Sequence, residues 1–237
     1  MTERLYQQDS YLKAFDARVI GHTNSGAILD RTAFYPGGGG QPCDVGSLAE
    51  SGGHIWNVTS MRVIDGAISH QITGDLPPVG QVVEGLVEWD RRYALMRTHT
   101  ALHILCGVVW RDYQAQVTGG NMEPRRGRLD FELERLDTNL VAEIEQKINV
   151  EVDAHREVRV DMLPRATAFE IPDLIRTKIN LLPKGIETVR IVEIVGLDLQ
   201  ADGGTHVANT REVGPLRITS HKSKGRINKR IVVELDP

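Results

Sequence analysis

Short runs of apolar residues alternate with turn residues over the first 88 positions of this 237-residue chain. Asn24-Ser25-Gly26, Asp65-Gly66 and Pro77-Pro78 are typical turn sequences between them. The apolar runs have the length of β-strands and lie at residues 27–29, 54–58, 61–64, 67–68 and 82–87. Short strands at this spacing predict a small barrel or sandwich.

The pattern changes near Trp89-Asp90. Apolar residues recur three and four apart from about residue 91 to 110, which predicts a helix with Asp90 as its N-cap. Further helices are predicted at 140–148, capped by Asp137 or Thr138, and at 166–179, interrupted at Pro172. The β-type patterns lie at 129–133, 158–162, 188–195, 216–220 and 231–235. Strands mixed with unevenly placed helices predict the α+β class.

The composition is that of an ordinary globular chain, with 41% hydrophobic and 25% charged residues. No apolar run reaches the roughly 18 residues that a membrane helix needs, so no membrane contact is expected. The N-terminus lacks a secretory pattern, and Cys43 and Cys106 alone do not indicate a disulfide scaffold. We therefore expect a cytoplasmic protein, with its oligomeric state open.

The net charge of -4 argues against indiscriminate nucleic-acid binding, but a basic strip stands out near the C-terminus. Between residues 217 and 230 there are six basic residues and no acidic one, namely Arg217, Lys222, Lys224, Arg226, Lys229 and Arg230. Such a strip binds phosphate or forms the solvated face of a hairpin, and the sequence leaves both readings open. Further candidates for phosphate contact are Arg91, Arg92, Arg125, Arg126 and Arg128.

Three histidines and an aspartate form a candidate metal site. His99 and His103 are four apart, so a helix presents both from one face. Asp202 and His206 lie across Gly203-Gly204 and offer two more donors. This donor set suits a divalent metal, with zinc the first expectation. Taken alone, the histidine pair could also be one core histidine and one surface histidine. The spacing resembles the His-Glu-x-x-His motif of metallopeptidases, but Thr100 stands where that motif has its general-base Glu. The peptidase mechanism is therefore disfavoured.

The second unusual segment is Phe34-Tyr35-Pro36-Gly37-Gly38-Gly39-Gly40-Gln41-Pro42. Four successive glycines allow close approach of a ligand to the backbone, or form a flexible loop between strands. The segment lacks the Lys-Ser/Thr of a phosphate-binding P-loop and opens no amphipathic helix, so neither nucleotide motif applies.

Together these segments resemble the editing regions of alanyl-tRNA synthetases. The glycine-rich segment, continued by Asp44 and Gly46, is similar to that family's glycine-rich signature, and Arg97-x-His99-Thr100-Ala101-x-His103 to its first metal motif. Gly203-Gly204-Thr205-His206-Val207 resembles the second metal motif, while 127–131 and 184–191 match connecting stretches. The chain looks like a freestanding alanyl-tRNA editing protein of the AlaX type, in its medium-length form.

This resemblance implies hydrolysis of mischarged tRNA(Ala), chiefly seryl-tRNA(Ala) and also glycyl-tRNA(Ala), with one bound zinc ion. It implies a small β-barrel domain over residues 1–88 and an α+β editing domain over 89–237, with an antiparallel sheet and flanking helices. The implied catalytic and metal-binding residues are His99, His103, Asp202 and His206. Substrate contacts are expected from Gly38, Gly39, Gly40, Gln41, Thr98 and Thr205, with Thr100 as a further hydroxyl partner, and tRNA contacts from the basic strip.

The sequence departs from the family pattern at Asp202, where the second motif usually has Cys. A carboxylate is a harder ligand than a thiolate. Three roles are therefore open for Asp202: a metal ligand, a partner that orients His206, or a base that acts on water. Cys106 is either a substitute ligand or a core residue. Two rival hypotheses are a zinc hydrolase of small esters and an RNA-binding module with structural zinc.

Overall fold

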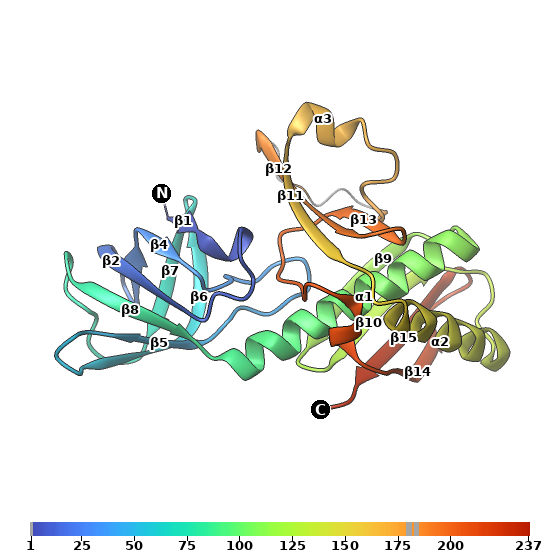
Figure 1. Ribbon diagram of the computed structural model, residues 1–237, viewed down its shortest axis with the longest axis horizontal. Coiled ribbons are helices and arrows are strands. Elements are labelled where there is room, and N and C mark those ends of the chain that lie inside the picture. The colour runs from blue at the N-terminus through green and yellow to red at the C-terminus, as the bar shows by residue number, and fades with distance from the viewer. Residues whose placement is uncertain (1, 179–181, 183–184) are drawn as a thin grey trace. The chain divides into compact units, whose positions relative to one another are not determined.

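The protein is described by a computed structural model that covers residues 2–178, 182 and 185–237 (Figure 1). Over these residues it contains three α-helices and mostly antiparallel sheets, so the α+β prediction is confirmed. The chain divides into two compact units, Met1–Gly38 with Pro42–Tyr93, and Gly39–Gln41 with Ala94–Pro237. None of the helices in the described ranges is both long and apolar enough to span a bilayer.

The first unit is built on six strands that form a closed barrel. In order of pairing they are β2 (Ala14–Thr23), β3 (Gly26–Leu29), β7 (Ala67–Ile72), β6 (Ile55–Ile64), β5 (Gly46–Ala49) and β8 (Val82–Val87), with β8 paired back to β2. Alternate residues of β2, such as Phe15, Ala17 and Val19, are buried in the core. Two further strands, β1 (Glu3–Arg4) and β4 (Arg31–Thr32), pair in parallel, and Leu5–Gln7 form a 3-10 turn.

The sequence pattern located some of these strands imperfectly. The runs at 54–58 and 61–64 belong to one strand, β6, which carries an irregularity between Val58 and Ser60. Strand β2 was not predicted because Asp16 and Arg18 interrupt its apolar residues, which leaves no more than two of them in succession. Strand β5 was missed because it begins with Gly46-Ser47, shortly after the glycine-rich segment, and has only Leu48 and Ala49 as apolar residues.

His70 is a fully buried histidine of the barrel core. Its Nδ1 lies 3.1 Å from the carbonyl oxygen of Ala27, and its Nε2 lies 2.8 Å from the hydroxyl of Thr32. A carbonyl oxygen only accepts, so Nδ1 carries the proton and Nε2 accepts from the hydroxyl. Burial lowers the pKa of His70 from 6.5 to about 4, although its backbone hydrogen bonds act in the opposite direction. The imidazole is therefore neutral at pH 7.

This lowered pKa makes stability depend on pH. Below pH 6.5 the unfolded chain binds the proton before the folded chain does, so the free energy of unfolding falls until about pH 4. A shift of this size corresponds to roughly 3 kcal/mol. In His70→Asn, urea unfolding followed by fluorescence should show a correspondingly smaller loss of stability between pH 7 and 4.5. His54→Asn, at an exposed position, should match the wild-type slope, and equal slopes for all three proteins would contradict the prediction.

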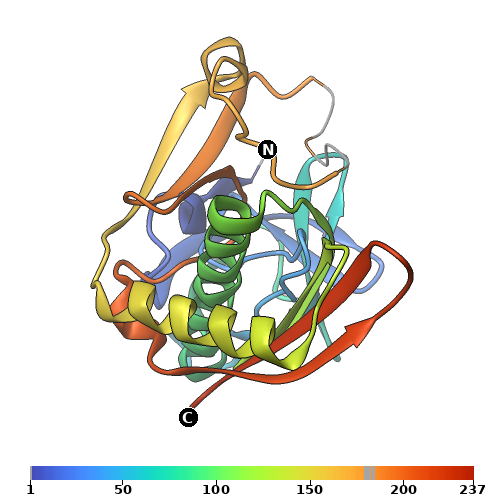
Figure 2. The same cartoon turned by 90° about the vertical axis from the view of Figure 1, so that its right-hand side faces the viewer.

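The second unit contains two antiparallel sheets. The larger has the order β14 (Leu216–Ser223), β15 (Asn228–Leu235), β10 (Arg126–Glu132) and β9 (Val117–Glu123). The smaller has the order β11 (Val158–Pro164), β12 (Thr188–Ile194) and β13 (Asp198–Ala201). The α-helices are α1 (Trp89–Tyr113), α2 (Thr138–Asp153) and α3 (Arg165–Phe169), and Thr210–Val213 form a 3-10 turn. Figure 2 shows α1 and α2 side by side on one face of the larger sheet.

Helix α1 is the element that carries the histidine pair, and its middle is enclosed by protein. Every residue from 98 to 109 is buried. On one side Leu102 packs against Gly127 of β10, and on another Gly107 lies against Leu197 and Asp198 at the start of β13. A helix that is apolar around most of its circumference is stable only in such surroundings. Both histidines are therefore held in the interior.

Three predictions for this unit need correction. Helix α1 begins at Trp89, so Asp90 lies in its first turn and is not the N-cap. The helix predicted at 166–179 is limited to α3, because Pro172 cannot continue a helix and restricts the residue before it; Ile179 lies outside the described residues. Strand β9 was not predicted because Gly119-Gly120 weaken its β pattern. Its antiparallel pairing with β10 stabilises the strand despite this low local preference.

Candidate metal centre

The four candidate ligands meet in the interior of the second unit. One donor atom from each of His99, His103, Asp202 and His206 lies within 4.8 Å of the others. The ring centres of His99 and His206 are 4.2 Å apart, and that of His103 lies 5.1 Å and 4.7 Å from them. Nitrogen ligands of a tetrahedral zinc ion are about 3.4 Å apart for bonds of about 2.1 Å. Small side-chain rotations therefore suffice for these donors to share one ion.

A hydrogen bond to Gln41 fixes the proton on His99. The Gln41 carbonyl oxygen accepts from the backbone N–H of Thr205 at 3.0 Å, and its amide nitrogen donates to the Thr205 hydroxyl at 2.8 Å. The amide is thus oriented with its oxygen toward His99 Nδ1, at 2.9 Å. His99 Nδ1 must then be the donor, which leaves the lone pair on Nε2. That nitrogen lies 3.6 Å from Asp202 and is available to a metal.

The other two histidines also have a partner at Nδ1, but only His103 has the same proton placement as His99, because His206 donates from Nε2 to the Asp202 carboxylate at 3.0 Å. His103 Nδ1 donates to the carboxylate of Asp198 at 3.0 Å, which leaves Nε2 as its free donor atom. His206 Nδ1 lies 3.2 Å from the hydroxyl of Thr100, which also accepts the N–H of Val207. Metal-bound histidines usually hold their second nitrogen in such a hydrogen bond. The arrangement of all three imidazoles therefore fits a metal centre.

Asp202 lies against two of the imidazoles. Its carboxylate accepts from Gly204 N–H at 2.8 Å and lies 3.0 Å from His206 Nε2. Arg190, on β12, donates to the Asp202 backbone carbonyl at 3.0 Å and approaches its carboxylate to 3.9 Å. These contacts hold Asp202 in a fixed rotamer, with one oxygen toward His99. The contacts fit a ligand, an orienting partner and a base equally well.

The charge states at neutral pH suit metal binding. Burial lowers the pKa of His99 to about 4 and that of His206 well below its usual value. Burial also acts on His103, but the hydrogen bond and charge of Asp198 outweigh it and raise its pKa. Burial would raise the pKa of Asp202, yet the neighbouring imidazoles hold it well below the usual range. Two neutral imidazoles and a carboxylate are therefore present at neutral pH, and His206 needs only to move its proton from Nε2 to Nδ1 to offer Nε2 to a cation.

Gly204 makes room for this arrangement. A Cβ atom at this position would lie 2.4 Å from His99 Cε1 and 2.6 Å from the Gln41 carbonyl oxygen. The neighbouring Gly203 is exposed, and a Cβ there would meet no atom within 4 Å. Only the second glycine of the Gly203-Gly204 pair is therefore required by packing.

The glycine-rich segment adopts backbone angles that favour glycine. Gly37, Gly38, Gly39 and Gly40 all have positive φ. Gly40 accepts the N–H of Met122 through its carbonyl, and a Cβ at this position would lie 3.2 Å from the carbonyl oxygen of Gly120. Of the expected substrate contacts in this segment, only Gln41, with the hydrogen bonds described above, touches a metal-site side chain in the parts of the chain that are described.

Other predicted residues are not among the clustered donors. The hydroxyl of Thr98 is engaged by the backbone, since it donates to Ala94 and accepts from Arg125 N–H. Cys106 is a buried core residue and is not among the clustered donors. Arg92, a candidate phosphate contact, is fully buried and paired with Asp44, which gives it a structural role. Thr205 is buried and bonded to Gln41.

The basic strip lies on the β14–β15 hairpin, and most of its charges have partners. Arg217 pairs with Asp236, and Arg230 makes two hydrogen bonds to Asp130, which Lys224 approaches to 3.6 Å. Lys229 is buried and donates to two backbone carbonyls. Within the described ranges, Lys222 and Arg226 are exposed and make no ion pair. Arg217 and Lys224 are exposed as well, but each has an acidic partner.

The sequence did not single out Asp198 or Arg190, both of which contact candidate ligands. Each lies in a strand among apolar residues, where a charged residue is unusual and predicts a buried partner. Arg190, between Val189 and Ile191, and Asp198 both show this signal. The sequence does not indicate which residue pairs with either of them. Lys184, in the resembling stretch 184–191, lies outside the described residues.

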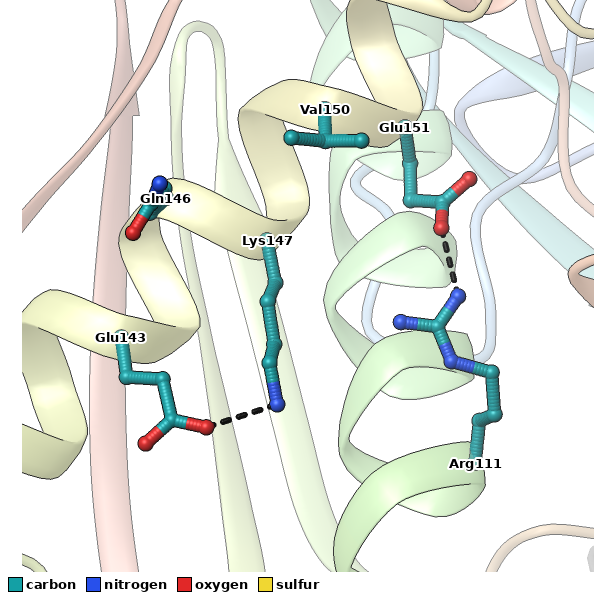
Figure 3. Close-up of a pocket in the computed structure, with 6 residues that line it drawn as sticks. All are labelled: Arg111, Glu143, Gln146, Lys147, Val150 and Glu151. Atoms are coloured by element: carbon teal, nitrogen blue, oxygen red, sulfur yellow. Dashed lines mark hydrogen bonds and ion pairs between the residues drawn. The ribbon is translucent and has the colours of Figure 1, made fainter.

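A surface pocket lies between α1 and α2, apart from the metal cluster (Figure 3). Arg111 pairs with Glu151 across it, and Lys147 pairs with Glu143 at 2.7 Å and with Asp112 at 2.9 Å. The charged side chains that line the pocket are thus paired with acidic or basic groups of the protein itself.

Comparison with known proteins identifies the family. Residues 189–232 match the second additional domain of threonyl and alanyl tRNA synthetases, and residues 7–91 match class II (A) tRNA synthetases. The chain is 40% identical to the alanyl-tRNA editing protein AlaX-M of Saccharolobus solfataricus over 100% of both chains. It belongs to the AlaX-M family of alanyl-tRNA editing proteins. The AlaX-M protein of Methanosarcina barkeri is 39% identical over 99% of each chain.

Alanine–tRNA ligases are also relatives of this AlaX-M family member. The enzyme of Ignicoccus hospitalis is 39% identical over 92% of this chain, but the match covers only 24% of the ligase. This chain therefore corresponds to one part of the larger enzyme. The resemblance inferred from the glycine-rich and histidine motifs is confirmed.

Proposed function

We propose that this chain removes the wrong amino acid from mischarged tRNA(Ala), chiefly serine and also glycine. As a member of the AlaX-M family it is an enzyme, an aminoacyl-tRNA deacylase. The observation that carries the proposal is the convergence of His99, His103, Asp202 and His206 in the interior of the second unit. In this scheme residues 89–237 form the editing domain, residues 1–88 form the barrel domain with the glycine-rich loop, and the protein acts in the cytoplasm.

The proposed metal is one zinc ion held by His99, His103 and His206. The imidazole donor set and the hydrogen bonds to Nδ1 described above fit zinc. When bound, zinc would supply a positive charge that polarises the ester carbonyl and lowers the pKa of water. Asp202 would complete the coordination or accept a proton from the attacking water, since it lies beside two of the three ligands.

The reaction is the hydrolysis of the ester between the amino acid and the terminal ribose. The oxygen of a water molecule bonds to the carbonyl carbon, the bond from that carbon to the ribose oxygen breaks, and the ribose oxygen takes a proton. If Asp202 is the base and not a ligand, its carboxylate accepts the proton that the water loses. Gly38, Gly39 and Gly40 would line the pocket for the aminoacyl end, because glycine leaves the backbone N–H groups accessible.

Selectivity for serine requires a partner for its hydroxyl. A buried polar group that pairs with this hydroxyl is left unpaired by alanine, which disfavours the correct amino acid. Of the hydroxyl candidates, Thr100 and Thr205 lie beside the cluster, whereas Thr98 bonds to the backbone. We propose that Thr100 or Thr205 makes this contact, in exchange for its present hydrogen bond.

The decisive experiment measures release of serine and of alanine from tRNA(Ala), with and without a zinc chelator. We expect serine to be released much faster than alanine, and chelation followed by zinc addition to abolish and restore the reaction. Hydrolysis of a minimal seryl ester at the same rate would instead favour a general esterase. Tight tRNA binding without deacylation would favour the structural-zinc module.

The tRNA contact is proposed at Lys222 and Arg226, the exposed cations of the basic strip that make no ion pair within the described residues. In Lys222→Ala/Arg226→Ala, tRNA affinity should fall, and the slope of log affinity against log salt should decrease by about 2, roughly one unit per lost phosphate contact. Binding measured by filter retention at several salt concentrations tests this. Arg62→Ala, at an exposed position of β6, is the control, and an unchanged slope in the double variant would exclude these contacts.

A further inference from the structure

We infer that Asp198 is a positioning residue that sets the affinity of the centre for its metal by holding His103. This inference rests on the proposed metal site, and it concerns a residue that takes no part in the proposed chemistry. Asp198 opens strand β13 and has a completely buried side chain, adjacent to the middle of α1.

The three ligand histidines differ in the group that contacts Nδ1. His99 bonds to a neutral amide and His206 contacts a hydroxyl, whereas His103 bonds to the carboxylate of Asp198. A carboxylate orients an imidazole and increases the electron density at its other nitrogen. His103 should therefore be the strongest of the three nitrogen donors.

Asp198 is itself held in place. The amide of Gln200 donates to its Oδ2 at 2.7 Å, and Arg176 approaches its Oδ1 to 4.0 Å. The Arg176 guanidinium lies 4.8 Å from the ring centre of Trp110 on α1. Burying a carboxylate is costly unless charge and hydrogen bonds compensate for it. Here His103 and Gln200 both bond to Oδ2, whereas the buried Oδ1 has no hydrogen-bond partner among the described residues and only the Arg176 charge near it, so the carboxylate is held through the oxygen that contacts the ligand.

A purely structural role makes a different prediction. If Asp198 only satisfies buried partners, its loss lowers stability and leaves the metal affinity of the folded protein unchanged. If it positions His103, the affinity of the folded protein falls. The two roles are therefore separated by metal binding measured on folded protein.

The test is zinc affinity by chelator competition, together with the visible spectrum of the Co²⁺-substituted protein. Asp198→Asn should bind zinc about 10- to 100-fold more weakly, with a shifted Co²⁺ spectrum and unchanged circular dichroism. Glu151→Gln removes another buried carboxylate, which pairs with Arg111 and Arg156 away from the cluster, and should bind zinc as the wild type does. Wild-type zinc affinity and spectrum in folded Asp198→Asn would overturn the inference.

A second variant covers the case in which Asp198→Asn does not fold. Gln200→Leu keeps both His103 and Asp198 but removes one hydrogen bond that holds the carboxylate, so zinc affinity should fall about fivefold. Unchanged affinity in this variant would count against the inference. Failure of the wild-type protein to bind zinc at all would instead contradict the proposed function, so the two failures are distinguishable.

Discussion

Replacing His206 with alanine should reduce deacylation of seryl-tRNA(Ala) about a thousandfold or more. The variant loses one of three imidazoles that meet at a single point, and with it the positive charge that the proposed metal places at the ester. A loss of about 4 kcal/mol in transition-state stabilisation corresponds to this factor. His103→Ala should behave in the same way. Single-turnover deacylation and zinc content by elemental analysis provide the two measurements.

The control is His54→Ala, which removes an exposed histidine of the barrel and should retain activity and zinc. A thermal melt of each variant separates loss of the metal from loss of the fold. Near-wild-type turnover by a zinc-free His103→Ala/His206→Ala protein would reject the proposed chemistry.

Adding one methyl group at Gly204 should be nearly as damaging. The new Cβ would lie 2.4 Å from His99 and 2.6 Å from Gln41, closer than carbon atoms approach non-bonded neighbours, so at least one of these side chains must move. Because the Gln41 amide orients His99, the displacement should reach the metal centre. Gly204→Ala should lower zinc affinity and reduce seryl-tRNA(Ala) deacylation about 100-fold.

Gly203→Ala is the matched control, because it adds the same methyl group one residue earlier. No atom lies within 4 Å of a Cβ at Gly203, so zinc affinity and activity should stay close to those of the wild type. Equal behaviour of the two variants, whether both active or both inactive, would show that packing around His99 is not the cause.

The sequence predicted the elements with strong local signals. Helix α1 followed from apolar residues at helical spacing, and β12 from its β-branched run. The His99–His103 pair followed from helical periodicity, because residues four apart share a face. The association of that pair with Asp202 and His206 was a hypothesis from their metal-donor chemistry, and the family resemblance supported it, since no local pattern places residues a hundred positions apart in contact.

The residues that support the ligands could not be predicted. Asp198 reaches His103 because β13 packs against α1, and Arg190 reaches Asp202 through the pairing of β12 with β13. Both contacts depend on tertiary packing, which has no periodicity in the sequence. Helix α3 is shorter than predicted because Pro172 ends the helical pattern early. Strand β9 was not predicted because its glycines disfavour a strand locally, whereas pairing with β10 stabilises it.

Residues Gly39–Gln41 belong to the second compact unit although they are encoded within the first. A fragment that starts at residue 94 would keep His99, His103, Asp202 and His206, yet it would lack the amide that orients His99. Truncation of this enzyme at the boundary between the two units would thus give a fragment that has all four metal donors but lacks the hydrogen bond between Gln41 and His99. An excised catalytic fragment should therefore retain the tripeptide 39–41, for example through a short grafted loop.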